Sequence, residues 1–119
     1  MTATATVEGK VLQVFGPVVD IDIEKIEKNA RAVTTLCSDH GIDVTGVTKV
    51  TCGMPQVAQA MIRGGVTQIG ESRLENIHRM RAGGVNRPMM LLRIPPLSAA
   101  EEIVRSVDVS LNSEFPVIR

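Results

Sequence analysis

The chain has 119 residues, 44% of them hydrophobic, which is enough apolar material for one small domain or part of one but not for two. Its 13 basic and 13 acidic residues cancel and form no basic run, so we expect no nucleic-acid partner. No segment is long and apolar enough to span a membrane, and the N-terminus lacks the pattern of a signal peptide, so we expect no membrane partner and a cytoplasmic location. Cys37 and Cys52 lack metal-ligand spacing, which favours free thiols in a reducing compartment and no metal site.

The first eighteen residues differ in pattern from the rest of the chain. Two apolar, alternating runs flank Gly16-Pro17, and this arrangement predicts a β-hairpin. We therefore divide the chain into an N-terminal extension over residues 1–18 and an α/β domain over residues 19–119.

The domain begins with a strand and a helix. Residues 18–23 read as a strand, and Asp22 is placed to cap the helix that follows. The apolar positions of this helix recur with helical spacing until Gly41. They are Ile26, Ala30, Val33 and Leu36.

The same strand–helix pattern then repeats along the chain. Further strands are predicted over residues 42–50, 66–70, 89–94 and 109–111. Pro55 suits the first turn of the second helix, whose apolar stripe is Val57, Ala58, Met61 and Ile62. Leu74 and Ile77 are expected to face the core from the third helix.

Two Ser-x-x-Glu patterns mark the predicted starts of the third and fourth helices. In Ser72–Glu75 and Ser98–Glu101 the serine and glutamate side chains are expected to bond the unpaired backbone N–H groups of the first turn. The fourth helix is expected to continue through Ile103 and Val104.

The order of elements predicts an α/β fold. Strands joined by helical crossovers are parallel, which leaves a barrel or a doubly wound sheet as candidates. The units are short and even, and a complete eight-unit barrel needs about 250 residues. We therefore predict a half TIM-type β/α barrel with an extra N-terminal hairpin. Its open sheet edges favour a homodimer.

Lys49 is the first candidate catalytic residue. It lies at the predicted carboxyl end of a parallel strand, where the catalytic loops of such barrels gather. Desolvation there would favour the neutral amine, which can condense with an aldehyde or ketone. The alternative is a lysine whose stem packs on the sheet edge while its amine reaches water.

Further candidates lie near other strand ends. Arg93 is placed to bind cofactor oxygens or a substrate carboxylate, or else to pair with a surface acid. Ser72 and Asn112 are weaker candidates for cofactor contact, since Ser72 has a capping role and Asn112 suits a turn. Cys52 is expected to be a small buried filler rather than a nucleophile.

Several long runs resemble one enzyme family. IDIEKIEKNAR, VTKVTCG, GGVTQIGESRLENIHRMRAGG, MMLLRIP and SVDVSLNSE resemble the alanine racemase-like, fold type III family of pyridoxal-phosphate enzymes, and most closely its ornithine racemase-like members. The resemblance implies a barrel, pyridoxal 5'-phosphate as cofactor and an amino acid as substrate. It also implies that Lys49 forms the internal aldimine and is one of two bases that interconvert the mirror forms.

Parts of the catalytic machinery that the resemblance implies are not found in this sequence. The second base of such racemases is commonly a tyrosine, and this chain has none. Much of the phosphate site also lies in the later half of the family's barrel. We therefore expect a truncated racemase domain with little activity of its own. The alternatives are a non-catalytic α/β scaffold and a pyridoxal-phosphate homeostasis protein, which the same family contains.

Residues 7–22, VEGKVLQVFGPVVDID, resemble the opening strands of the catalytic beta subunit of the rotary ATP synthase. No Gly-x-x-x-x-Gly-Lys-Ser/Thr run follows, so ATP chemistry is not expected. The change of resemblance near residues 19–23 suggests a fusion, a chimera or an artificial sequence.

Overall fold

The computed structural model describes residues 2–3 and 19–118. Its helices are α1 (Ile23–Ser38), α2 (Pro55–Arg63), α3 (Leu74–Ala82), α4 (Ala100–Ser106) and α5 (Phe115–Ile118). Its strands are β1 (Thr2–Ala3), β2 (Ile21–Asp22), β3 (Thr45–Val47), β4 (Gln68–Glu71), β5 (Met89–Leu91) and β6 (Val109–Ser110). Two 3₁₀ turns are η1 (Lys49–Thr51) and η2 (Leu97–Ala99).

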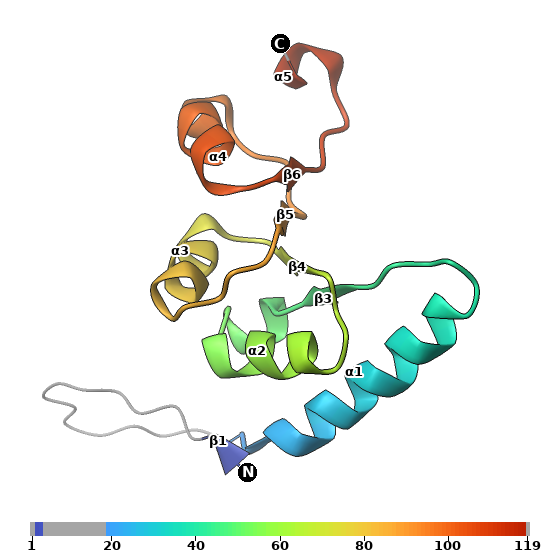
Figure 1. The fold of residues 1–119 in the computed structure, drawn as a ribbon. Coiled ribbons are helices and arrows are strands. Elements are labelled where there is room, and N and C mark those ends of the chain that lie inside the picture. Colours follow the sequence, from blue (N-terminus) through green and yellow to red (C-terminus); the bar gives the residue numbers. More distant parts are fainter. Residues whose placement is uncertain (1, 4–18, 119) are drawn as a thin grey trace, which may run out of the picture.

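Four strands form one parallel sheet in the order β3-β4-β5-β6, which is also their order along the chain. A helix connects each strand to the next, and α2, α3 and α4 lie on the same side of the row of strands (Figure 1). This arrangement of sequential parallel strands with helices outside them is that of a barrel segment. The predicted α/β half barrel is confirmed.

The strand register sends alternate side chains to opposite faces of the sheet. Ile69 on β4 pairs with Met89 on β5, and both are fully buried under the helices. They belong to the main hydrophobic core, which lies between the sheet and α2, α3 and α4. Its buried members are Ala58, Val66, Ile69, Ile77, Met80, Val85, Met89, Leu91 and Ile103.

The other face of the sheet is the inner face of the half barrel. Val47 pairs with Gly70, and Met90 pairs with Val109, so these four residues share that face. Val47 and Val109 are 39% and 38% exposed. In a closed barrel this face is covered by the remaining strands and the side chains that fill the interior. In the described part of the chain it is open.

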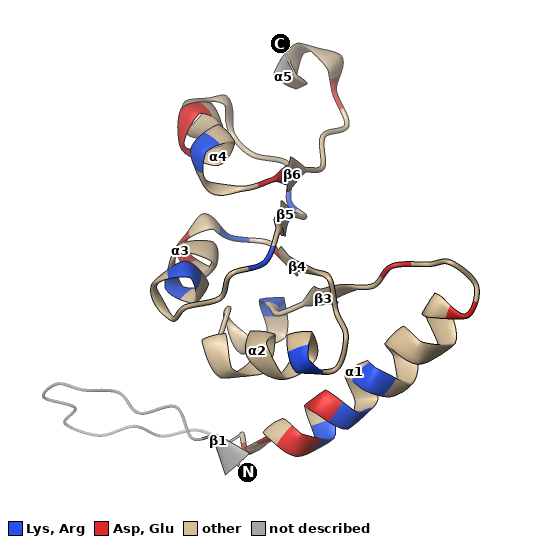
Figure 2. Ribbon diagram, viewed as in Figure 1, with Lys and Arg blue, Asp and Glu red and all other residues tan. Residues whose placement is uncertain are grey.

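Helix α1 begins and packs as its sequence predicts over its first half. Asp22 accepts a hydrogen bond of 3.1 Å from the Lys25 backbone N–H, as expected for an N-cap, and that bond lowers the pKa of the Asp22 carboxyl. Acidic and basic residues alternate along this half of the helix (Figure 2). Glu27 bonds both Arg63 of α2, at 2.8 Å, and Arg31, at 3.1 Å. The Arg63 hydrogen bond, and then that of Arg31, lowers the pKa of the Glu27 carboxyl.

The second half of α1 departs from the prediction. Val33 and Leu36 were expected to continue the apolar stripe, but they are 51% and 65% exposed. Helix α1 has 16 residues and its packing partner α2 has 9, so the end of α1 extends past α2 (Figure 1).

The strand predicted over residues 18–23 is shorter and pairs differently. Among the described residues 19–23, only Ile21–Asp22 forms a strand, and it pairs antiparallel with Thr2–Ala3 instead of joining the parallel sheet. The helix that Asp22 caps begins at Ile23, so the strand cannot include the last residue of the predicted range. The hairpin predicted over residues 1–18 lies outside the described residues except for Thr2–Ala3.

Both predicted capping boxes are wrong. Helix α3 begins at Leu74 with Arg73 as its N-cap, so Ser72 lies one position too early to cap it. Ser98 lies inside η2, and α4 begins only at Ala100, so its hydroxyl makes no capping bond either. Ile103 of α4 is buried as expected, whereas Val104 is 81% exposed. None of the helices in the described ranges has the length and hydropathy needed to cross a bilayer.

Candidate active site

Lys49 stands just beyond the carboxyl end of β3. The strand predicted over residues 42–50 ends at Val47, and Lys49 opens the 3₁₀ turn η1. The chain turns here because the Thr48 carbonyl accepts the backbone N–H groups of Thr51, at 3.0 Å, and Gly53, at 3.2 Å. The Lys49 side chain is exposed and forms no ion pair with another described residue, so the expected desolvation is not found in this part of the barrel.

The turn is packed directly against helix α3. Gly53 has φ +66°, and a Cβ atom there would lie 2.7 Å from the Asn76 Cβ and 2.8 Å from the Asn76 carbonyl oxygen. Arg79 Nη1 also donates a 2.6 Å hydrogen bond to the Cys52 carbonyl. The Cys52 side chain is exposed, and its prediction as a buried filler is wrong because a left-handed backbone, with φ +53°, directs it outward.

A buried carboxylate joins the ends of β3 and β4. Glu71 has no exposed surface, and its Oε2 accepts a 2.9 Å hydrogen bond from the Thr48 hydroxyl. Its Oε1 accepts bonds from the Ser72 backbone N–H, at 2.6 Å, and from the Ser72 hydroxyl, at 3.1 Å. Glu71 and Thr48 were not predicted from the sequence. The available signal was an acidic residue at the end of an apolar parallel strand, where a side chain facing the helices is buried.

Three of the four predicted cofactor-binding residues line one depression at this edge of the sheet. Lys49, Ser72 and Arg93, which follow β3, β4 and β5, surround a space of about 730 Å³. Arg73 and Arg79 add two more cations, and the one acidic residue of the lining is Glu75. The depression therefore has a positive balance and a primary amine on its wall.

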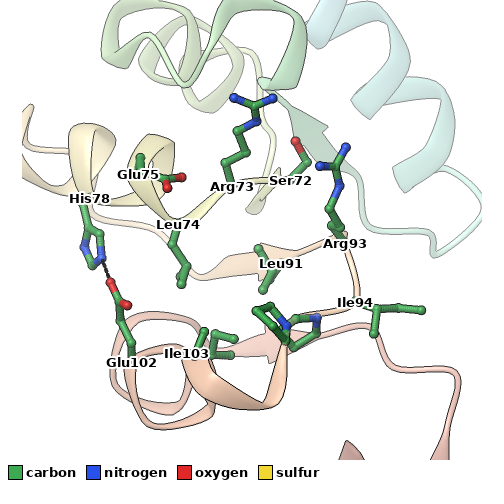
Figure 3. Close-up of a pocket in the computed structure, with 13 residues that line it drawn as sticks. Ser72, Arg73, Leu74, Glu75, His78, Leu91, Arg93, Ile94, Glu102 and Ile103 are labelled. Carbon is green, nitrogen blue, oxygen red and sulfur yellow. Dashed lines mark hydrogen bonds and ion pairs between the residues drawn. The ribbon is translucent and has the colours of Figure 1, made fainter.

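Arg93 is available to an external ligand. It is exposed and forms no ion pair within the described ranges, so the alternative of a partner acid on the surface is not found there. Figure 3 shows Ser72, Arg73 and Arg93 beside one another, at the rim of a neighbouring hollow with an apolar wall that includes Leu91 and Ile103. This edge therefore offers cationic groups next to apolar surface.

Asn112, the fourth predicted cofactor-binding residue, and the two histidines do not line the depression around Lys49. Asn112 donates hydrogen bonds to the carbonyl, at 3.3 Å, and hydroxyl, at 3.0 Å, of Ser110. His78 Nε2 lies 2.8 Å from Glu102 Oε1 on α4, as the dashed line in Figure 3 marks. His40 contacts the Leu36 carbonyl at the end of α1, through Nδ1 at 3.0 Å.

Comparison with known proteins gives consistent matches. The family described as the N-terminal domain of alanine racemase matches residues 21–115. The lysine racemase of Thermotoga maritima is 41% identical over 99 residues, which are 83% of this chain and 28% of that protein. The ornithine racemase of Acetoanaerobium sticklandii is 30% identical over 103 residues, which are 87% of this chain and 29% of that protein. The chain thus spans less than a third of these relatives.

A solved structure supports the architecture alone. The crystal structure of alanine racemase from E. faecalis superposes with a TM-score of 0.71 at 19% identity, and the match covers 82% of this chain and 27% of that one. At this identity the similarity shows the fold, and it agrees with the parallel half barrel described above.

Proposed function

The chain belongs to the family of alanine racemase N-terminal domains, and from this membership we propose that it binds pyridoxal 5'-phosphate through Lys49 as the first part of the barrel of an amino-acid racemase. The observation that carries the proposal is the convergence of Lys49, Ser72 and Arg93, from three successive strand ends, on one depression. Residues far apart in sequence meet there at the edge where barrel enzymes place their chemistry.

The residues of the depression fit an anionic aldehyde. The Lys49 amine can condense with the aldehyde and release water, and a volume of about 730 Å³ with four cations in its lining suits a phosphate-bearing ring. When bound, the cofactor would supply an electron sink that makes the α-proton of an amino acid removable. The site favours a negatively charged ligand, because the lining has four basic residues and Glu75 is its one acidic residue.

Each residue has a proposed task in that reaction. Lys49 holds the cofactor and then moves a proton on one face of the substrate. Arg93 binds a carboxylate or the cofactor oxygens as a bidentate donor, and Ser72 adds a hydroxyl at the rim. Asn112 stays a weaker proposal, because its amide is bonded to Ser110. The names of the relatives support lysine, ornithine or alanine as the substrate class.

A second base must come from outside these residues. The chain has no tyrosine and spans less than a third of its relatives, so we propose that it binds cofactor but racemises amino acids poorly on its own. The exposure of Lys49 favours the same conclusion, because a desolvated site is what raises the reactivity of such a lysine. Cofactor binding without turnover, as in a homeostasis protein of this family, is the second candidate function.

Self-association is a further part of the proposal. The inner face of the sheet exposes Val47 and Val109, and β6 has no partner on its outer edge among the described strands. An unpaired edge and an open apolar face favour pairing with a second copy. We also propose the division into residues 1–18 and 19–119, which the family match from residue 21 supports.

A titration with pyridoxal phosphate tests cofactor binding. The wild-type chain is expected to develop a saturable visible absorbance band, which Lys49→Ala abolishes. Lys28, an exposed residue of α1, provides the matched control, and Lys28→Ala is expected to titrate as the wild type does. An unchanged band in Lys49→Ala would contradict the proposed attachment site and favour the scaffold alternative.

A further inference from the structure

The buried carboxylate of Glu71 has no role in the function proposed above. We propose that Glu71 is a positioning residue, which fixes the turn that carries Lys49 by bonding Thr48 and fixes the rim by bonding Ser72. The consequence for the cofactor rests on the proposed function, but the effect on the turn can be measured without cofactor.

The carboxylate is held by hydrogen-bond donors alone. All three of its bonds come from uncharged groups, at 2.6 to 3.1 Å, and no described Lys or Arg forms an ion pair with it. A buried carboxylate is costly unless such donors satisfy it. An apolar side chain at this helix-facing position would continue the core, since Glu71 pairs with buried Leu91. Core packing therefore does not explain why a carboxylate occupies this position.

Thr48 transmits the position of Glu71 to Lys49. Thr48 is 1% exposed, its backbone N–H donates to the Gly70 carbonyl at 3.1 Å, and its hydroxyl donates to Glu71. Its carbonyl accepts the two N–H groups that close the turn. A shift of the Thr48 side chain therefore moves the backbone immediately before Lys49.

Ser72 transmits the same constraint to the opposite wall. Both its backbone N–H and its hydroxyl are bonded to Glu71 Oε1, so neither is free to turn away. Glu71 thus links Lys49 and Ser72, which lie 23 positions apart, through one rigid group. Preorganised geometry of this kind is what a covalent site on a strand end requires.

A pair of Thr48 variants separates positioning from simple stability. Thr48→Val keeps the shape but leaves Glu71 Oε2 without its donor, whereas Thr48→Ser keeps the hydroxyl. Amide hydrogen exchange of Thr51, Cys52 and Gly53 is measured relative to the amides of α2 in the same chain. The α2 amides report any global loss of stability, because global unfolding exposes them together with the turn, whereas a local loosening speeds the turn amides alone. Glu71→Gln is the second variant, since its amide oxygen can replace only part of the network.

The expected result is a turn that opens about tenfold more often in Thr48→Val and remains near wild type in Thr48→Ser. Glu71→Gln should fall between them. Thr48→Val should also weaken the affinity for pyridoxal phosphate, so that the concentration giving half of the maximal visible band rises by about tenfold. An unchanged exchange ratio in both Thr48→Val and Glu71→Gln would overturn the inference, as would a faster turn with unaltered cofactor affinity. If the wild type binds no cofactor, the proposed function fails and the exchange ratio alone decides the inference.

Discussion

Gly53 is the position at which a single methyl group should disturb both the fold and the site. Its φ of +66° costs an L-residue about 1–2 kcal/mol. A Cβ would also lie 2.7, 2.8 and 3.0 Å from the Cβ, carbonyl oxygen and Cα of Asn76, of which two are backbone atoms of α3 that cannot swing away. Such overpacking costs about 1–3 kcal/mol. We expect Gly53→Ala to lower the free energy of unfolding by about 2–5 kcal/mol.

Gly41 provides the matched control. Its φ is +69°, and nothing lies within 4 Å of the position that a Cβ would take there, so Gly41→Ala carries the backbone cost without the clash. Urea unfolding followed by circular dichroism is expected to place Gly41→Ala about 1–2 kcal/mol below the wild type and Gly53→Ala clearly below that. Equal losses in the two variants would refute the packing of the Lys49 turn against α3.

Three further outcomes follow from other contacts. The hydrogen bonds from Arg63 and Arg31 lower the pKa of Glu27 in the folded state. The stability that they add is therefore present at neutral pH and is lost as the pH falls below the ordinary glutamate pKa of about 4.3. Unfolding curves of Glu27→Gln, measured across this pH range, should lack that acid dependence. Sedimentation equilibrium should show a concentration-dependent dimer that Val109→Lys weakens and Val104→Lys, on the outer helix face, leaves intact; a strictly monomeric wild type would exclude association through the open face. Racemisation of lysine, ornithine or alanine should stay near the rate of free pyridoxal phosphate, and robust turnover would show that the second base lies within this chain.

Hydrophobic periodicity predicted the elements that pack through a continuous stripe. Ile77 and Ala58 are buried in the core against the sheet as expected, because short helices over a parallel sheet leave one face to bury. Val57 is buried with Ile23 of α1 in a second cluster. The same rule failed for Val33 and Leu36, where burial depends on the length of the neighbouring helix. Local pattern carries no information on that length.

The site was predicted in part for a similar reason. Strand ends in a parallel sheet share one edge, so Lys49, Ser72 and Arg93 could be grouped from sequence. Glu71 was missed although it directly follows a predicted strand, because which face of the sheet it occupies depends on the register that pairs it with Leu91. The Ser72 capping box failed because the Ser72 hydroxyl has a local partner in the Glu71 carboxylate, a competition that spacing alone does not reveal.

The most direct test of the account is to locate the cofactor on the chain. The protein is mixed with pyridoxal phosphate, reduced with borohydride, digested and mapped by mass spectrometry. The chain has four lysines, Lys10, Lys25, Lys28 and Lys49, so the label has few possible positions. We expect the label to saturate on Lys49 at a concentration where the other three lysines stay largely unmodified. Labelling spread evenly over the four, or concentrated on a lysine other than Lys49, would contradict it.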